Sequence, residues 1–388
     1  LLQRGLNIGK VLLLPQLGSM LASAAREVFG SSVDVDTPLS EAGLGHQGAK
    51  EFIDVLSQRL GLGSLPAALV FEFPTLRQLE ARLATPAAPT TAAVQSPRPA
   101  SLDVAVAGSS CLLPGGVASL EALQATSSTG CDLVDEVPAT RWDVNHSPRG
   151  YGAAVLGRAR HGGFMQGAEL FDNARFNVSP AEAAAMDPQQ RLLLEHGYAA
   201  LHASGFERAS LMGSGAGVAV GITQTEFNQV LAAGPLQRSV YTATSSSLSV
   251  ASGRLSFVLG LQGPCAAFET ACSASLVGCH SALRALQHGE CEQHLAAGVN
   301  AMLLPVVGLA FAVAGMTSPT GRSHTFDSRA DGFARGEGCA VAVLATPSER
   351  GPASVLHRGA GLVLRGSCVR QDGKSASLTA PNGQAQQA

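Results

Sequence analysis

The amino-acid sequence predicts an α/β protein over residues 101–388, preceded by a small all-α unit over residues 16–84. Short apolar runs separated by helix-like stretches fill the larger region, which is typical of a sheet covered by helices on both faces. Five such runs are expected to form strands: residues 102–108, 217–222, 264–268, 295–300 and 339–344. In the smaller region apolar residues recur at intervals of three and four, which indicates amphipathic helices.

Composition limits the classes of function that the chain can have. Its 388 residues include 26 Lys and Arg against 29 Asp and Glu, so the net charge is −3. This balance lacks the basic excess typical of proteins that bind nucleic acids or anionic membranes. No apolar run reaches the roughly 18 residues that a membrane-spanning helix needs. We therefore expect no nucleic-acid partner and no membrane span.

The smaller unit is expected to contain three main helices. Their apolar positions are Leu17, Leu21, Ala24 and Val28, then Ala49, Phe52, Ile53 and Leu56, and finally Leu79 and Leu83. Residues 85–100 follow and are rich in Ala, Pro, Thr and Ser. Such a composition cannot bury a core, so we expect an extended linker there.

Cys272 is the candidate catalytic residue. It follows the predicted strand 264–268 and precedes a helix pattern with Leu276 on its apolar face, which Gly289 is placed to end. A thiol at such a turn lies near unpaired backbone N–H groups and the positive end of the helix dipole, which favour the thiolate. Because the thiolate is the nucleophilic form, the position predicts acyl transfer through a thioester.

The other seven cysteines are expected to pack in the core, where free cysteine behaves as a small hydrophobe. They are Cys111, Cys131, Cys265, Cys279, Cys291, Cys339 and Cys368. None forms a C-x-x-C pair, and no histidine cluster has the spacing of zinc ligands, so we expect neither disulfides nor a metal site. This pattern favours an intracellular, reducing compartment, either the cytoplasm or an organelle such as a plastid.

The surroundings of Cys272 resemble the nucleophile motif of β-ketoacyl synthases, specifically the ketosynthase domains of modular polyketide synthases. The resemblance extends over residues 101–388 and follows the order of that family. It rests on MDPQQRLLLE at residues 186–195, RLSFVLGLQGP at 254–264, FETACSASL at 268–276, DGFARGEG at 331–338 and LTAPNG at 378–383.

The resemblance implies a thiolase fold, of which this chain holds the N-terminal portion, and a decarboxylative Claisen condensation. In the family, an acyl group moves from a carrier's pantetheine to the cysteine, whose place Cys272 takes. A malonyl-type thioester then loses CO₂ and attacks the acyl group. The family's two catalytic histidines are expected beyond Ala388, and none of the ten histidines here matches their context. We therefore expect a fragment, truncated at its C-terminal side, that is inactive alone.

The implied partners are acyl carrier protein domains that bear acyl or malonyl thioesters, and a second copy of the ketosynthase domain. No cofactor is expected on this chain itself. Phosphopantetheine is expected on the partner carrier domains.

Residues 16–84 resemble an acyl carrier protein domain, and residues 1–15 resemble the tail of an upstream reductase domain, the alternative being a plain apolar leader. Carrier domains attach phosphopantetheine to the serine of a Gly-Leu-Asp-Ser-Leu phrase at the start of their second helix. Here residues 43–47 read GLGHQ, and His46 occupies the serine's place. A phosphodiester needs a hydroxyl oxygen, so we expect a carrier-like fold without the cofactor, in which His46 is a solvated residue at a helix start.

An inactive carrier motif leaves a second interpretation open, in which the region is a non-catalytic scaffold or docking part of a synthase. Two further motifs are expected to be structural. The segment 335–338 predicts a buried ion pair at a strand start, and Asp187 and Pro188 predict a capped helix start. The glycines of residues 213–221 do not form a dinucleotide fingerprint, because they precede and occupy a strand.

Overall fold

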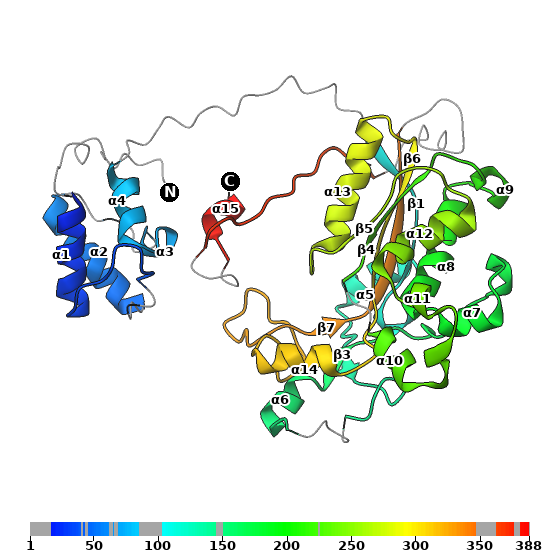
Figure 1. Ribbon diagram of the computed structural model, residues 1–388, viewed down its shortest axis with the longest axis horizontal. Helices are drawn as coiled ribbons and strands as arrows, with labels where there is room; N and C mark the ends of the chain where they lie inside the picture. Colours follow the sequence, from blue (N-terminus) through cyan, green and yellow to red (C-terminus); the bar gives the residue numbers. More distant parts are fainter. Residues whose placement is uncertain are drawn as a thin grey trace. The chain divides into compact units, whose positions relative to one another are not determined.

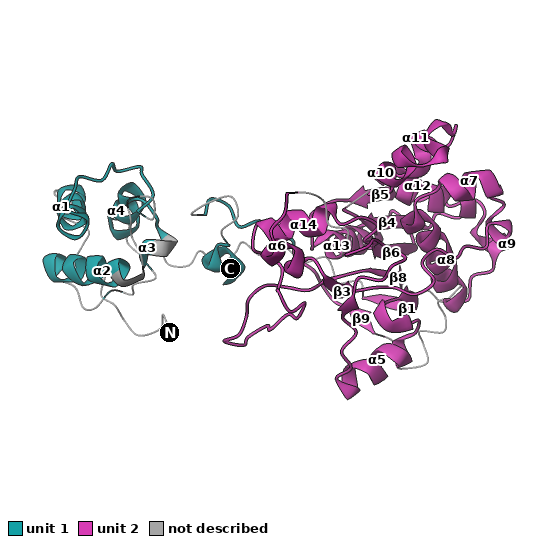
Figure 2. Cartoon of the chain, turned by 90° about the horizontal axis from the view of Figure 1, so that it is seen from below, with its two compact units in different colours: residues 1–98, 369–388 teal, residues 99–368 magenta. Residues whose placement is uncertain are grey.

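The structure is a computed structural model. It describes residues 17–39, 42, 46–61, 65, 69–84, 103–144, 150–223, 226–346, 362–375 and 381–387. The chain divides into two compact units, one of residues 1–98 and 369–388 and one of residues 99–368 (Figure 2). The strand-like run before residue 16, the predicted linker 85–100 and residues 378–380 of the phrase at 378–383 lie outside the described residues.

The first unit is built from helices that share one apolar core. These helices are α1 (Leu17–Phe29), α2 (His46–Leu60), α3 (Leu69–Glu72) and α4 (Leu76–Ala84), whereas α15 (Gly383–Gln387), near the end of the chain, has no buried residue. Leu21, Phe52 and Leu79 are fully buried, one from each of the three predicted helices. The periodicity that predicted these helices is therefore confirmed. The single turn of α3 was missed because four residues carry too few periodic positions.

A six-stranded mixed sheet forms the centre of the second unit, in the order β5-β4-β6-β8-β1-β9. Its strands are β1 (Val104–Leu112), β4 (Gly217–Gly221), β5 (Cys265–Phe268), β6 (Gln293–Asn300), β8 (Gly338–Ala345) and β9 (Val363–Leu364). β4 runs parallel to both β5 and β6, and the other neighbouring pairs are antiparallel. All five predicted strands are confirmed.

Ten helices of the second unit lie among the described residues. They are α5 (Leu120–Thr129), α6 (Ala153–Arg158), α7 (Pro180–Ala185), α8 (Pro188–Ala203), α9 (Arg208–Leu211), α10 (Phe227–Ala233), α11 (Thr242–Ser245), α12 (Leu248–Leu259), α13 (Ala274–Gln287) and α14 (Val306–Val313). A small second sheet contains β2 (Asp135–Glu136), β3 (His161–Gly163) and β7 (Arg335–Gly336). Across the described residues, no helix has the length and apolarity needed to cross a membrane.

Helices cover both faces of the large sheet, as the apolar strands predicted. α8 and α12 pack on one face, where Leu193, Leu255 and Val218 belong to the larger core cluster (Figure 1). α13 packs on the other face, where Leu283 and Leu286 meet Ala219. The residues of β4 alternate between the two clusters, which explains why the whole strand is buried.

Two details of the predicted burial are wrong. Cys265 and Ala266 are exposed, because β5 is the edge strand of the sheet and pairs only with β4. Leu276 is 73% exposed, although the pattern placed it on the buried face of its helix. The residues of α13 that are buried are mostly small, and they are Ala274, Gly278, Ala282, Leu283, Ala285 and Leu286.

Small residues matter because α13 begins directly against the sheet. A Cβ atom at Gly221, the last residue of β4, would lie 2.3 Å from the backbone nitrogen of Ser275. A Cβ atom at Gly298 in β6 would lie 2.7 Å from the Ser275 Cβ atom. Only glycine permits such an approach of two backbones. These two glycines therefore determine where the first turn of α13 lies.

The predicted buried ion pair is confirmed at Glu337, which directly precedes β8. Both of its oxygens accept hydrogen bonds from Arg141, at 3.0 Å each. They also accept from the backbone N–H groups of Met165 at 2.8 Å and Met302 at 2.9 Å. The carboxylate is fully buried and fully paired, so removing Arg141 would leave an uncompensated charge, at a cost of about 3–5 kcal/mol.

The start of α8 is also as predicted, with Asp187 as the N-cap and Pro188 in the first turn. The Asp187 carboxylate accepts a hydrogen bond from the Gln189 backbone N–H at 2.8 Å. Burial raises the pKa of Asp187 to about 6, and the bonds to Gln189 oppose this shift. The Gln189 side chain in turn accepts a bond from the Ala301 backbone N–H, which ties α8 to the end of β6.

Replacing Gly221 tests whether this close approach constrains the fold. We expect Gly221→Ala to lower the free energy of unfolding by about 1–3 kcal/mol, because the added methyl group overlaps the Ser275 backbone. Gly253 is a matched control inside α12, since a Cβ atom there would meet nothing within 4 Å. Gly253→Ala should be neutral or stabilising by up to about 1 kcal/mol, because alanine is the better helix former. Urea denaturation of both variants measures the difference, and equal stabilities would contradict the constraint.

Candidate active site

Cys272 lies on a tight turn between β5 and α13. Ala271, directly before it, has a φ of +51°, in the left-handed region that non-glycine residues rarely adopt. Such strain clusters at functional sites, where the surrounding structure enforces it. α13 begins two residues after Cys272, at Ala274, and its first turn is fixed by Gly221 and Gly298. Cys272 therefore lies in a short turn between the end of β5 and the start of α13, and the position of that helix start is fixed by packing.

Hydrogen bonds within the turn hold this conformation. The Ser273 hydroxyl donates to the Thr270 carbonyl oxygen at 2.8 Å and contacts the Thr270 hydroxyl oxygen at 2.9 Å. The backbone N–H of Ala274 donates to the Ala271 carbonyl at 3.1 Å. The Ser273 side chain makes no capping bond to the helix, so it does not occupy the N–H groups of the first turn that follow Ala274. Uncapped N–H groups of this kind can stabilise an oxyanion on a bound acyl group.

The thiol of Cys272 is exposed, and so are Ala271 and Leu276 beside it. The prediction that all other cysteines pack in the core is partly wrong. Cys131, Cys265 and Cys368 are also exposed, while Cys111, Cys291 and Cys339 are buried and Cys279 is intermediate. The apolar context of Cys265 misled the prediction because its strand lies at the sheet edge.

Burial sets the buried thiols apart chemically. It raises the pKa values of Cys111, Cys279 and Cys339, and it raises the pKa of Cys291 to about 11. These groups therefore stay protonated near neutral pH and are poor nucleophiles. Exposure leaves Cys272, Cys131, Cys265 and Cys368 as the reachable thiols, and of these only Cys272 lies two residues before the start of a long helix.

Within the described part of the chain, no histidine is hydrogen-bonded to Cys272. His280, on the nucleophile helix, shares a 2.8 Å hydrogen bond between its Nδ1 and the Ser367 hydroxyl. His294 lies inside β6 rather than before it, and its Nδ1 is 3.0 Å from the Leu295 carbonyl oxygen. Burial lowers the pKa of His294, so its imidazole stays neutral. Both imidazoles are thus engaged elsewhere in the fold.

His46 is the first residue of α2, and its side chain lies outside the described residues. This position agrees with the expected helix start, 226 residues before Cys272 in the chain and in the other compact unit. A search of the described residues for three or more His, Cys, Asp or Glu side chains that could hold a metal ion finds none.

Sequence patterns missed the residues that shape the turn. Gly221 and Gly298 were recognised only as parts of strands, and Ala271 carries no signal for a left-handed conformation. Glycine at the carboxyl end of two parallel strands was the available clue, since it often marks a close backbone approach.

Residues 102–350 match the family model "Beta-ketoacyl synthase, N-terminal domain", which covers more than half of the chain. The chain is 38% identical over 381 residues to Erythronolide synthase EryA2 from Saccharopolyspora erythraea, covering 95% of this chain and 10% of that protein. It is 37% identical over 385 residues to Polyketide synthase GfsA from Streptomyces halstedii, covering 97% of this chain and 5% of that protein.

The solved structures that resemble this chain are also ketosynthases. The ketosynthase from module 6 of the bacillaene synthase from Bacillus subtilis 168 is 31% identical with a TM-score of 0.62, over 73% of this chain and 46% of that one. The oxazolomycin ketosynthase domain OzmH KS7 from Streptomyces albus JA3453 is 31% identical with a TM-score of 0.65, over 73% of this chain and 49% of that one. The chain thus spans less than half of each ketosynthase. Its α/β fold is that of ketosynthase domains, and the chain belongs to the β-ketoacyl synthase family.

Proposed function

We propose that the second unit is the nucleophile-bearing part of a polyketide synthase ketosynthase, and that Cys272 is the residue that accepts the acyl group. The observation that carries this proposal is the turn itself. An exposed thiol follows a left-handed Ala271 and lies two residues before a helix whose first turn is seated on the sheet. The similarity to ketosynthase domains supports the same assignment.

In the loading step, the Cys272 thiolate attacks the carbonyl carbon of an acyl-pantetheine thioester. A new C–S bond forms to Cys272, the C–S bond to pantetheine breaks, and the pantetheine thiolate leaves and takes up a proton. Backbone N–H groups at the start of α13 and at Cys272 would stabilise the oxyanion that develops. This step needs the thiol and the N–H groups, both of which lie among the described residues.

Condensation is proposed for the whole protein. There a malonyl-type carrier thioester would lose CO₂, and the resulting carbanion would attack the acyl carbonyl and release the Cys272 thiolate. Neutral imidazoles assist such a decarboxylation in general, because they can donate hydrogen bonds to the enolate oxygen. The partners of the reaction would be carrier domains that present acyl and malonyl-type thioesters on phosphopantetheine.

A homodimer through the ketosynthase part is proposed as well. β5 lies at the edge of the sheet with Cys265 and Ala266 exposed, and an uncovered strand edge favours pairing with another chain. Sedimentation of the chain should show a dimer, and a monomer across the whole concentration range would contradict this proposal.

We also propose that the first unit has a carrier-like fold that takes no phosphopantetheine. Its helices enclose one core, and the alignments with the curated relatives cover 95–97% of the chain, so they include most of this unit. His46 begins α2, at the place where carrier domains have their serine. The scaffold interpretation differs from the leading proposal in requiring no acyl transfer at Cys272.

Acyl loading tests the assignment of Cys272. The full chain is incubated with a soluble acyl-pantetheine thioester, and peptide mass spectrometry locates the adduct. We expect the adduct on Cys272, its complete loss in Cys272→Ser and its retention in Cys265→Ser, since Cys265 is exposed but lies within a strand. An adduct spread evenly over the exposed cysteines, or none at all, would favour the scaffold.

Phosphopantetheine transfer tests the first unit. With a phosphopantetheinyl transferase and coenzyme A, the wild-type chain should gain no mass, because imidazole cannot replace the hydroxyl that forms the phosphodiester. A variant with Gly45→Asp, His46→Ser and Gln47→Leu restores the carrier phrase and should gain one phosphopantetheine group. Modification of the wild-type chain would refute the loss of the cofactor, and an unmodified triple variant would refute the carrier-like fold.

A further inference from the structure

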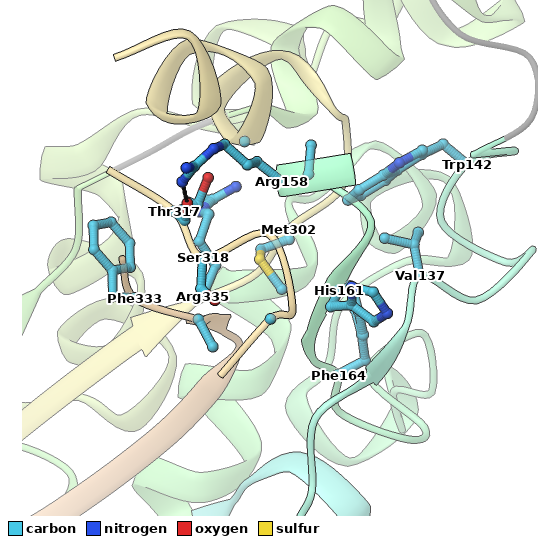
Figure 3. Close-up of a pocket in the computed structure, with 14 residues that line it drawn as sticks. Val137, Trp142, Arg158, His161, Phe164, Met302, Thr317, Ser318, Phe333 and Arg335 are labelled. Carbon is cyan, nitrogen blue, oxygen red and sulfur yellow. Dashed lines mark hydrogen bonds between the residues drawn. The ribbon is translucent and has the colours of Figure 1, made fainter. Parts of the chain in front are cut away.

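A second site lies at the carboxyl end of β6, in a cavity between β3, β7 and the start of α14 (Figure 3). Met302, two residues after β6, and Arg335, in β7, both line it. The cavity is small, with a volume of about 10 Å³. The space that an occupant could fill is therefore close to that of one water molecule.

The polar groups that line this cavity are mainly hydrogen-bond donors. Its polar lining consists of Trp142, Arg158, His161, Thr317, Ser318 and Arg335, and no aspartate or glutamate lines it. Figure 3 shows Arg158 and Thr317 on one side of the cavity and His161 on the other. Glu226 and Glu337 act on Arg335 from outside the lining, so the positive charge that remains for the cavity comes mainly from Arg158, and it favours a negative charge there.

Two of the polar atoms at this cavity have no partner in the described structure. Thr317 is only 3% exposed, and its Oγ1 has no hydrogen-bond partner. The Nδ1 of His161 is buried and also has none. Leaving a buried polar atom unpaired costs free energy, so each of these atoms calls for an occupant that forms a hydrogen bond with it.

Of the arginines near the cavity, Arg141 and Arg335 have carboxylates close by, while Arg158 has no carboxylate partner among the described residues. Glu337 pairs with Arg141, and Glu226 is the other carboxylate close enough to act on Arg335. One oxygen of Glu226 accepts bonds of 2.7 Å from the N–H groups of Leu303 and Leu304. Among the described residues, by contrast, Arg158 donates only to the carbonyl oxygens of Thr317 and Asp331.

We propose that this cavity binds one small monovalent anion, either a halide ion or the carboxylate group of a short acid. The guanidinium groups, mainly that of Arg158, would supply the opposite charge, and the Thr317 hydroxyl would donate the hydrogen bond that it lacks in the described structure. A halide carries its single charge on one atom near the size of a water molecule, and formate is the smallest molecule that presents a carboxylate. Phosphate and sulfate are too large for the space. The site does not depend on the acyl chemistry of Cys272.

Trp142 makes the proposal testable in solution, because it is the chain's only tryptophan and lines the cavity. Bromide quenches tryptophan by contact, and collisional quenching rises linearly with concentration. A bound bromide adds a saturable component. We expect the full chain to show that component at constant ionic strength, formate to suppress it if carboxylates bind, and sulfate to have no effect. Purely linear quenching would overturn the proposal.

Three variants separate the site from general salt effects. Thr317→Val keeps the shape of the side chain without its hydroxyl and should weaken the saturable component at least about tenfold, while Thr317→Ser should retain it. Arg329→Gln is the control, because Arg329 is exposed and pairs with Asp327 away from the cavity lining. Equal quenching in Thr317→Val and the wild type would contradict the site.

Crystals of the wild-type chain grown in bromide provide a test that needs no variant. We expect an anomalous peak within hydrogen-bond distance of the Thr317 Oγ1. An ordered water only, without anomalous signal, would refute the anion.

Discussion

The close approach of α13 to the sheet is the constraint on which the rest of the site depends. Gly221 is the last residue of β4 and Gly298 lies within the neighbouring β6, and Ser275 packs directly against both. Because the first turn of α13 packs there, only Glu269 to Ser273 connect the end of β5 to the helix. Ala271 takes the left-handed conformation that this short path demands. The position of the Cys272 thiol follows from packing two and three residues away.

A second set of constraints, made of buried hydrogen bonds, lies at the same carboxyl end of the strands. Glu337 joins Arg141 to the backbones of Met165 and Met302, so one buried carboxylate connects segments up to 196 residues apart. Gln189 at the start of α8 reaches the end of β6 in a similar way. These bonds fix the loops around the sheet edge, where ligands of open α/β sheets usually bind. The nucleophile turn and the donor-lined cavity both belong to this edge.

Sequence patterns predicted the strands, the main helices and the position of Cys272 between a strand and a helix, because apolar periodicity is a local signal. These patterns failed where contacts with residues distant in the sequence determine whether a side chain is buried. Cys265 and Leu276 look like core residues in sequence, but one lies on an edge strand and the other on the face of α13 away from the sheet. The left-handed Ala271 and the unpaired Thr317 hydroxyl also carry no local signal, since contacts distant in sequence produce them.

The most direct measurement of the central claim is the alkylation rate of each cysteine in the folded full chain, resolved by peptide mass spectrometry near neutral pH. Exposure alone would make Cys131, Cys265, Cys272 and Cys368 comparable, because all four are exposed. If the seated helix start activates its neighbouring thiol, iodoacetamide reacts with Cys272 well before the other three, and Gly221→Ala slows Cys272 while leaving the others unchanged. Equal rates at all four cysteines in the wild-type chain would contradict the account.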